Sequence, residues 1–172
     1  MNGAWIEPRY DTLTVVASIF IAIYASYVAL DLAKRVVGSD RAVARGWLIG
    51  GSVAMGTGIW AMHFVGMLAY RLPIDIGYDP LRTFVSWVAA VVVSLVALGV
   101  ATRRQLSAAR LVTGSLAMGA GICAMHYLGM AAMLMQPGIV WDLRLVAASV
   151  AIAVGASAVA LVIFFWLRRR TH

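Results

Sequence analysis

Apolar residues gather in five long stretches of this chain, and the short segments between them hold most of the charged residues. A helix needs about 20 predominantly apolar residues to cross the hydrocarbon core of a bilayer, and each stretch reaches that length. The pattern therefore predicts an all-α membrane protein with five transmembrane helices, at residues 12–33, 47–70, 81–102, 111–135 and 143–167. Because the connections are short, we expect one compact transmembrane domain over residues 1–172, surrounded by lipid and without an output domain.

The polar residues inside these stretches follow two alternating patterns. The second and fourth stretches carry methionines, glycines and one histidine each, and we call them the histidine helices. The other three, which we call the serine helices, carry serines at matching offsets and follow an aromatic–aspartate pair: Tyr10–Asp11, Tyr78–Asp79 and Trp141–Asp142. Each aspartate stands where a carboxylate caps a helix N-terminus. The alternation predicts a parallel internal repeat of two-helix units, in which equivalent helices share one orientation in the membrane.

Composition and charge place the chain in a membrane with a definite orientation. With 63% hydrophobic and 12% charged residues, it lies far outside the range of soluble globular domains. Ten of its fourteen cations lie on one side of the predicted topology: Lys34, Arg35, Arg41, Arg45, Arg103, Arg104, Arg110 and Arg168–Arg170. By the positive-inside rule this side is cytoplasmic, so the N-terminus is outside and the C-terminus inside. The net charge of +7 is thus explained without a nucleic-acid partner.

The histidine helices carry the candidate chemistry. Met55-Gly56-x-Gly58-Ile59 leads to Met62-His63 and Met67, and the same residue types recur 63 positions later in Met118-Gly119-x-Gly121-Ile122, Met125-His126 and Met130. A histidine at bilayer depth is costly and is a functional hypothesis by default. At about 100° per residue, the four methionine and histidine side chains of each helix fall within about 140° of arc. The repetition therefore favours a bound metal or cofactor.

Imidazole and thioether groups form a soft-to-borderline ligand set, which suits copper, above all Cu(I). We expect ligands from both helices, either in one shared four-coordinate site or with a separate ion on each helix. They are His63, His126, Met62, Met67, Met125 and Met130, with Met55, Met118 and Cys123 as further donors. Two structural alternatives stay open. Methionine often fills gaps in a core, and each histidine could instead be hydrogen-bonded to Ser26 or Ser94 of a neighbouring helix.

These motifs resemble those of the MHYT family of bacterial integral membrane sensors. The resemblance rests on Met62-His63-Phe64-Val65-Gly66-Met67, on Met125-His126-Tyr127-Leu128-Gly129-Met130 and on Ser26-Tyr27-Val28-Ala29-Leu30-Asp31-Leu32-Ala33. It implies copper near the outer membrane face, with the same histidines and flanking methionines as ligands and Tyr127 as a further site residue. It also implies sensing of O2, CO or NO and signalling to cytoplasmic cyclase, phosphodiesterase or DNA-binding domains.

The chain departs from the family pattern in ways that bear on its partners. Family members usually have seven spans and three motifs, whereas five spans and two motifs are found here, and Phe64 replaces the motif tyrosine. If a third motif supplies an essential ligand, a second copy of the chain must supply it, which favours a homo-oligomer. The other expected partner is a cytoplasmic signalling protein. We expect the chain to be a multi-pass protein of the bacterial inner membrane.

Three functions are compatible with the sequence. The first is a copper-binding sensory module that is not an enzyme, because no nucleophile–base–carboxylate set or phosphate-binding loop is present. The second is electron transfer through a b-type haem with His63 and His126 as axial ligands, since haem iron accepts imidazole. The third is a conduit for copper or protons, although Asp31 is the only acidic residue within a predicted span.

Overall fold

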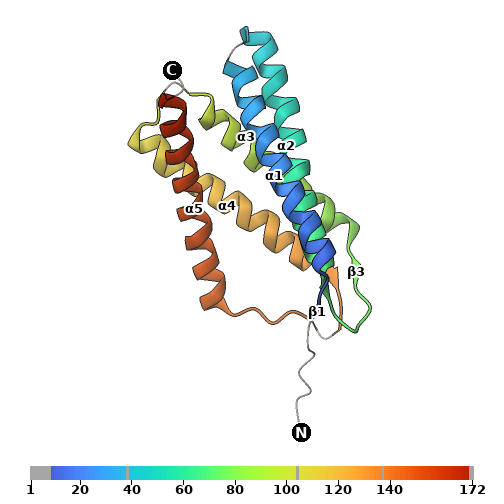
Figure 1. Ribbon diagram of the computed structural model, residues 1–172. Coiled ribbons are helices and arrows are strands. Elements are labelled where there is room, and N and C mark those ends of the chain that lie inside the picture. The colour runs from blue at the N-terminus through green and yellow to red at the C-terminus, as the bar shows by residue number, and fades with distance from the viewer. Residues whose placement is uncertain (1–8, 38, 104, 137, 171–172) are drawn as a thin grey trace.

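The computed structural model describes residues 9–37, 39–103, 105–136 and 138–170 (Figure 1). Within these ranges there are five helices, all long and apolar enough to cross a membrane. They are α1 (Thr12–Val37), α2 (Arg41–Ala69), α3 (Pro80–Ala101), α4 (Ala108–Ala131) and α5 (Leu143–Arg170). The prediction of an all-helical membrane protein with five spans is confirmed.

The ends of the helices differ from the ends of the predicted spans by up to six residues. Helix α1 continues to Val37 and α2 begins at Arg41, because the charged residues at the ends of long helices extend beyond the apolar span. Helix α4 ends at Ala131 instead of residue 135. The backbone beyond it becomes extended and pairs with another segment, which satisfies its hydrogen-bonding groups outside the helix.

Four short strands join the helix ends on one side of the molecule (Figure 1). Strand β1 (Arg9–Tyr10) pairs antiparallel with β2 (Tyr70–Arg71), and β3 (Gly77–Tyr78) pairs antiparallel with β4 (Met133–Leu134). In each case the start of a serine helix is held against the end of the histidine helix that follows it. Each histidine helix therefore ends in an antiparallel strand pair.

Matching backbone hydrogen bonds complete these two connections. Asp11 N–H donates to the carbonyl oxygen of Ala69 over 2.9 Å, and Asp79 N–H donates to that of Ala132 over 2.8 Å. The capping role expected for the aspartates is found at Asp79 and Asp142, whose carboxylates accept the backbone N–H of Arg82 and Arg144. At Asp11 the carboxylate accepts the Thr14 hydroxyl over 2.5 Å.

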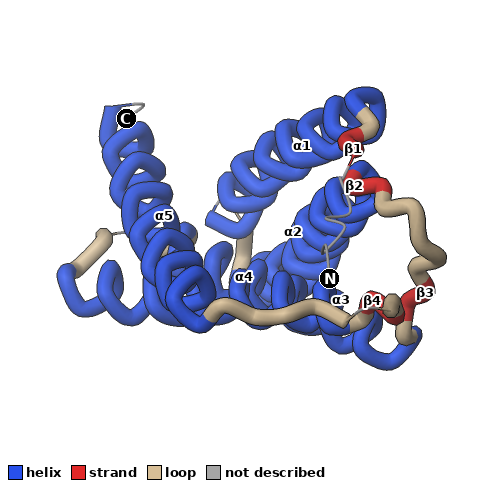
Figure 2. The backbone as a smooth tube through the Cα atoms, turned by 90° about the horizontal axis from the view of Figure 1, so that it is seen from below, coloured by secondary structure: helices blue, strands red, loops and turns tan. Residues whose placement is uncertain are grey.

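Each helix packs mainly against the next one along the chain, so the helices form a series with α1 and α5 at its ends. Figures 1 and 2 show these two helices standing apart, in an arrangement more open than the compact bundle expected from the sequence. A small core of Leu32, Ala33 and Leu98 joins α1 to α3, with Leu48, Met55 and Phe164 against it. Most other large apolar side chains are exposed, as expected for a surface in contact with lipid.

Glycines allow each histidine helix to approach the following serine helix closely. A Cβ atom at Gly56 of α2 would lie 2.6 Å from the Cα atom of Val91 in α3. A Cβ atom at Gly119 of α4 would lie 2.8 Å from the Cα atom of Val154 in α5. Both glycines therefore have the role in close helix packing that is typical of small residues in membrane helices.

Candidate metal centre

His63 of α2 and His126 of α4 lie in direct ring contact. Their ring centroids are 5.0 Å apart and the ring planes meet at 63°. Helices α2 and α4 are separated in sequence by α3, and most of their surfaces pack on other helices. The contact therefore brings together the two histidines that occupy equivalent positions in the two motifs.

The Nε2 atom of His63 is buried and has no hydrogen-bond partner among the described residues. The alternative in which a serine of a neighbouring helix satisfies the histidine is not found. Ser26 donates to the Ala22 carbonyl and Ser94 to the Ala90 carbonyl, each over 2.8 Å and within its own helix. A buried polar atom without a partner is rare and costs free energy. His63 thus presents a nitrogen atom that is available to a ligand.

Gly129 of α4 lies against this nitrogen, and its lack of a side chain permits the close approach. A Cβ atom at position 129 would lie 2.9 Å from His63 Nε2 and 3.2 Å from Cδ2 of the same ring. This contact was not expected from the sequence. The alternation of glycine with the ligand candidates in both motifs is the signal from which it could have been found.

Aromatic rings surround the histidine pair. Phe64 packs edge-on against His63, and Tyr127 packs edge-on against His126, with centroid distances of 5.6 and 5.0 Å. Tyr78 of β3 contacts Phe64, and burial raises the pKa of the Tyr78 hydroxyl. The rings limit water access to the imidazoles, which strengthens polar interactions within the site.

Two further hydrogen bonds attach the histidine helices to the serine helices that follow them. Trp60 Nε1 donates to the Ser86 hydroxyl over 3.0 Å, and the Tyr127 hydroxyl is hydrogen-bonded to the Ser149 hydroxyl. Ser86 and Ser149 occupy matching positions in α3 and α5, so the two bonds are equivalent although different aromatic residues make them. These attachments were also missed from the sequence, although the matched serines pointed to them.

The methionine and cysteine candidates differ in their surroundings. Met125 is buried in the core with 4% of its surface exposed. Met55 packs against the Leu32 and Leu98 core, and it stands eight residues, or about 12 Å, before His63 along α2. The remaining candidates are partly buried: Met62, Met67, Met118, Cys123 and Met130. The structure thus associates Met55 with the core more closely than with the histidine pair.

Comparisons with known proteins show that the chain is similar to bacterial signalling proteins. The chain matches the MHYT family model, described as the N-terminal repeat of bacterial signalling proteins, over residues 56–114 and 119–172. The two matched segments begin 63 residues apart, the same offset that separates the two histidines. No solved structure matches the chain.

Three curated relatives match almost all of the chain. The bifunctional diguanylate cyclase/cyclic di-GMP phosphodiesterase MucR of Pseudomonas aeruginosa is 52% identical over 159 residues, which are 92% of this chain and 23% of the relative. The signaling protein YkoW of Bacillus subtilis is 40% identical over 97% of this chain and 21% of its own length. The cyclic di-GMP phosphodiesterase NbdA of Pseudomonas aeruginosa is 37% identical over 94% and 20%. The chain thus spans about a fifth of these relatives.

Proposed function

This chain belongs to the MHYT family of bacterial signalling proteins, and on that basis we propose that it is a copper-binding sensory domain of a multi-pass inner-membrane protein. The observation that carries the proposal is the contact of His63 with His126, with the buried Nε2 atom of His63 left unpartnered. A purely structural pair of histidines has no reason to leave a nitrogen atom unsatisfied inside an apolar helix pair.

The chemistry of the donors fits copper. Two imidazoles meet between helices that also carry thioethers close to each histidine in sequence, and this combination suits soft to borderline ions. Within the described residues there is no group of three or more histidine, cysteine, aspartate or glutamate side chains that could hold a metal ion, so the proposed site depends on the methionine thioethers. The ligands we propose are His63 and His126 with the flanking methionines Met62, Met67, Met125 and Met130.

The protein residues perform separate tasks in this account. Bound copper supplies a redox-active centre that can take up O2, CO or NO. His63 and His126 hold the ion, Gly129 permits the close approach of α4 to His63, and Phe64 and Tyr127 pack against the imidazoles. The site is preorganised because strand pairing fixes the ends of both histidine helices.

The haem alternative fits this geometry less well. Two axial imidazoles are separated by iron and two metal–nitrogen bonds of about 2 Å each, so their ring centroids lie more than about 6 Å apart. The centroids of His63 and His126 are 5.0 Å apart, and the rings meet edge to face. A conduit is favoured even less, because the carboxylate of Asp31 is already paired with Arg35 over 2.6 Å.

The proposed orientation places the site in the outer leaflet. The charge distribution favours a cytoplasmic location for the end of the molecule that carries Lys34, Arg45 and Arg110. The paired strands then lie at the outer face. His63 is six residues before the end of α2, which corresponds to about 9 Å along the helix from that face. The two-helix units would then form a parallel repeat, with both histidines at equal depth.

We further propose that α5 conducts the signal to the cytoplasm. Tyr127 contacts His126 on one side and is hydrogen-bonded to Ser149 of α5 on the other. A change at the histidine pair therefore acts on a helix that, in the proposed orientation, ends on the cytoplasmic side. MucR and NbdA carry the names of cyclic di-GMP enzymes, so cyclic di-GMP turnover is the output we propose, in the same polypeptide, in a partner protein or in a homo-oligomer.

A competition titration tests the proposal. The full chain in detergent is titrated with Cu(I) against a colorimetric chelator, together with the variants His63→Ala, His126→Ala and Trp87→Ala. Trp87 is the control because it is hydrogen-bonded to Thr57 and has no contact with the histidine pair among those described. We expect each histidine variant to lose at least tenfold in Cu(I) affinity while the control does not change. Unchanged affinity in both histidine variants would refute the proposal.

A further inference from the structure

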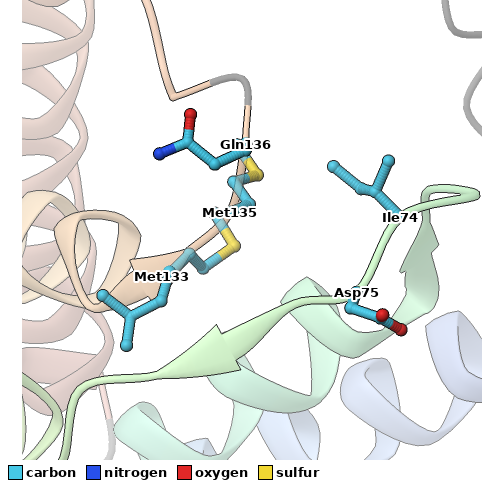
Figure 3. Close-up of a pocket in the computed structure, with 6 residues that line it drawn as sticks. Ile74, Asp75, Met133, Met135 and Gln136 are labelled. Carbon is cyan, nitrogen blue, oxygen red and sulfur yellow. The ribbon is translucent and has the colours of Figure 1, made fainter.

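A second group of soft donors lies outside the histidine pair, at the end of the molecule where the strands meet. An open pocket there is lined by Ile74, Asp75, Met133, Leu134, Met135 and Gln136. Figure 3 shows Met133, Met135 and Gln136 on one wall of this pocket, with Ile74 and Asp75 on the other. The two walls come from the segment before β3 and from the segment that includes β4.

Strand pairing explains why these residues meet. Tyr78 is opposite Met133 and Gly77 is opposite Leu134, so the loop that carries Asp75 is held beside the segment that follows α4. In an extended segment alternate side chains lie on the same face. The spacing of Met133 and Met135 therefore places both thioethers toward one side, where both line the pocket. A helical continuation of α4 would have separated them by about 200°.

Packing does not account for these two methionines. Methionine is normally used to fill gaps in apolar cores, yet both side chains are only partly buried and line an open pocket. The neighbouring Asp75 is exposed and makes no ion pair within the described ranges. The pocket thus combines two thioethers with an anionic carboxylate and an amide oxygen.

We infer that Met133 and Met135, with the charge of Asp75 on the facing wall, form a second metal site for a soft monovalent ion, Cu(I) or its redox-inert analogue Ag(I). Thioethers select such ions over magnesium, calcium or manganese, which prefer oxygen ligands. The carboxylate contributes the charge that attracts a cation, because opposite charges at close range lower the energy of the pair. The site binds its ion by ligand exchange alone, with no change of oxidation state.

The position of this pocket in the chain indicates a role in the entry of the ion. The same helix that carries His126 leads into the pocket seven residues later, at Met133. In the orientation proposed above, the pocket is the first set of soft ligands that an ion arriving from outside meets. This entry role rests on the proposed function of the histidine pair, whereas binding of the ion by the pocket does not.

The test uses the full chain in detergent, labelled with carbon-13 at the methionine methyl groups and titrated with Ag(I). Four samples are compared: wild type, M133L/M135L, H63A/H126A and the control Val140→Ala, which changes a residue that is 95% exposed. Leucine replaces methionine with little change of volume, so the fold is expected to persist. The readouts are the number of bound Ag(I) ions per chain and the methyl shifts assigned to Met133 and Met135.

We expect M133L/M135L to bind one Ag(I) ion fewer than wild type, and H63A/H126A to retain the Ag(I)-dependent shifts of Met133 and Met135. Asp75→Asn, which leaves the core untouched, is expected to weaken this site by roughly twofold to fivefold, the scale of one exposed charge interaction. The control should match wild type.

Two results would overturn the inference: equal Ag(I) content in M133L/M135L and wild type, or loss of the Met133 and Met135 shifts in H63A/H126A. If M133L/M135L loses one ion while H63A/H126A loses none, the pocket is confirmed and the proposed function of the histidine pair fails. The two proposals are therefore tested separately.

Discussion

Gly129 of α4 lies against His63 of α2 so closely that a Cβ atom at position 129 would be 2.9 Å from Nε2 of the imidazole. That nitrogen is buried and unpartnered within the described part of the chain. The glycine therefore permits α4 to lie close to the ring nitrogen that we propose as a metal ligand. Replacing Gly129 tests whether Nε2 of His63 binds the metal ion.

Gly129→Ala is expected to weaken Cu(I) binding at least tenfold, since the added methyl group occupies the approach to Nε2 or displaces the ring. Gly155→Ala is the matched control, because nothing lies within 4 Å of a Cβ atom at that position. A chelator competition titration measures both. Wild-type affinity in Gly129→Ala would show that Nε2 does not bind the ion from this side.

Gly56→Ala and Gly119→Ala are expected to destabilise the helix pairs α2–α3 and α4–α5 by about 1–3 kcal/mol each, the usual cost of overpacking. In both cases the new Cβ atom would meet backbone of the next helix at less than 3.0 Å. Gly99→Ala, where nothing lies within 4 Å, is the control. Reversible unfolding in mixed micelles measures the change, and equal stability of all three variants would contradict the packing described here.

Tyr127→Phe removes the hydroxyl that is hydrogen-bonded to Ser149 and is expected to lower stability by about 0.5–1.5 kcal/mol, the usual net value of one hydrogen bond. Copper content should be unchanged, because the hydroxyl already has a partner. A double-mutant cycle with Ser149→Ala isolates the pair. Loss of copper in Tyr127→Phe would instead identify the hydroxyl as a ligand.

The strand connection at the start of α1 is expected to weaken in acid. Hydrogen bonding from Thr14 and the charge of Arg71, the latter at 3.2 Å, lower the pKa of the Asp11 carboxyl below its ordinary value. A carboxyl with a lowered pKa in the folded state contributes stability above its unfolded pKa of about 3.9 and loses it as the pH falls through the folded value. The stability difference between wild type and Asp11→Asn should therefore be constant near neutral pH and shrink below about pH 4. A difference that does not change with pH would contradict this assignment.

The five helices and the paired motifs were predictable because they depend on local patterns. The length of apolar runs fixes the spans, and the repeated Met-His element identifies two equivalent helices. The end of α4 was not predictable, because apolar residues 132–135 continue the helical composition while strand pairing with Gly77 and Tyr78 decides their conformation. Long-range pairing of this kind leaves no signal in a single window of sequence.

The residues of the site were predictable from the sequence, but the contacts between them were not. His63 and His126 were expected to act together, but their ring contact depends on how α2 and α4 converge across α3. The Gly129 contact and the hydrogen bonds to Ser86 and Ser149 depend on the same helix positions. Each results from tertiary packing, which spacing along one helix does not specify.

Metal content of the purified chain tests the central claim most directly. Elemental mass spectrometry and a visible spectrum are recorded on the same detergent-purified samples of wild type, H63A/H126A and Trp87→Ala. The account predicts copper in wild type and in Trp87→Ala, its loss from H63A/H126A except for ions held by the Met133 and Met135 pocket, and insertion of all three proteins in the membrane. Iron with a Soret band, or copper content that does not depend on the two histidines, would contradict it.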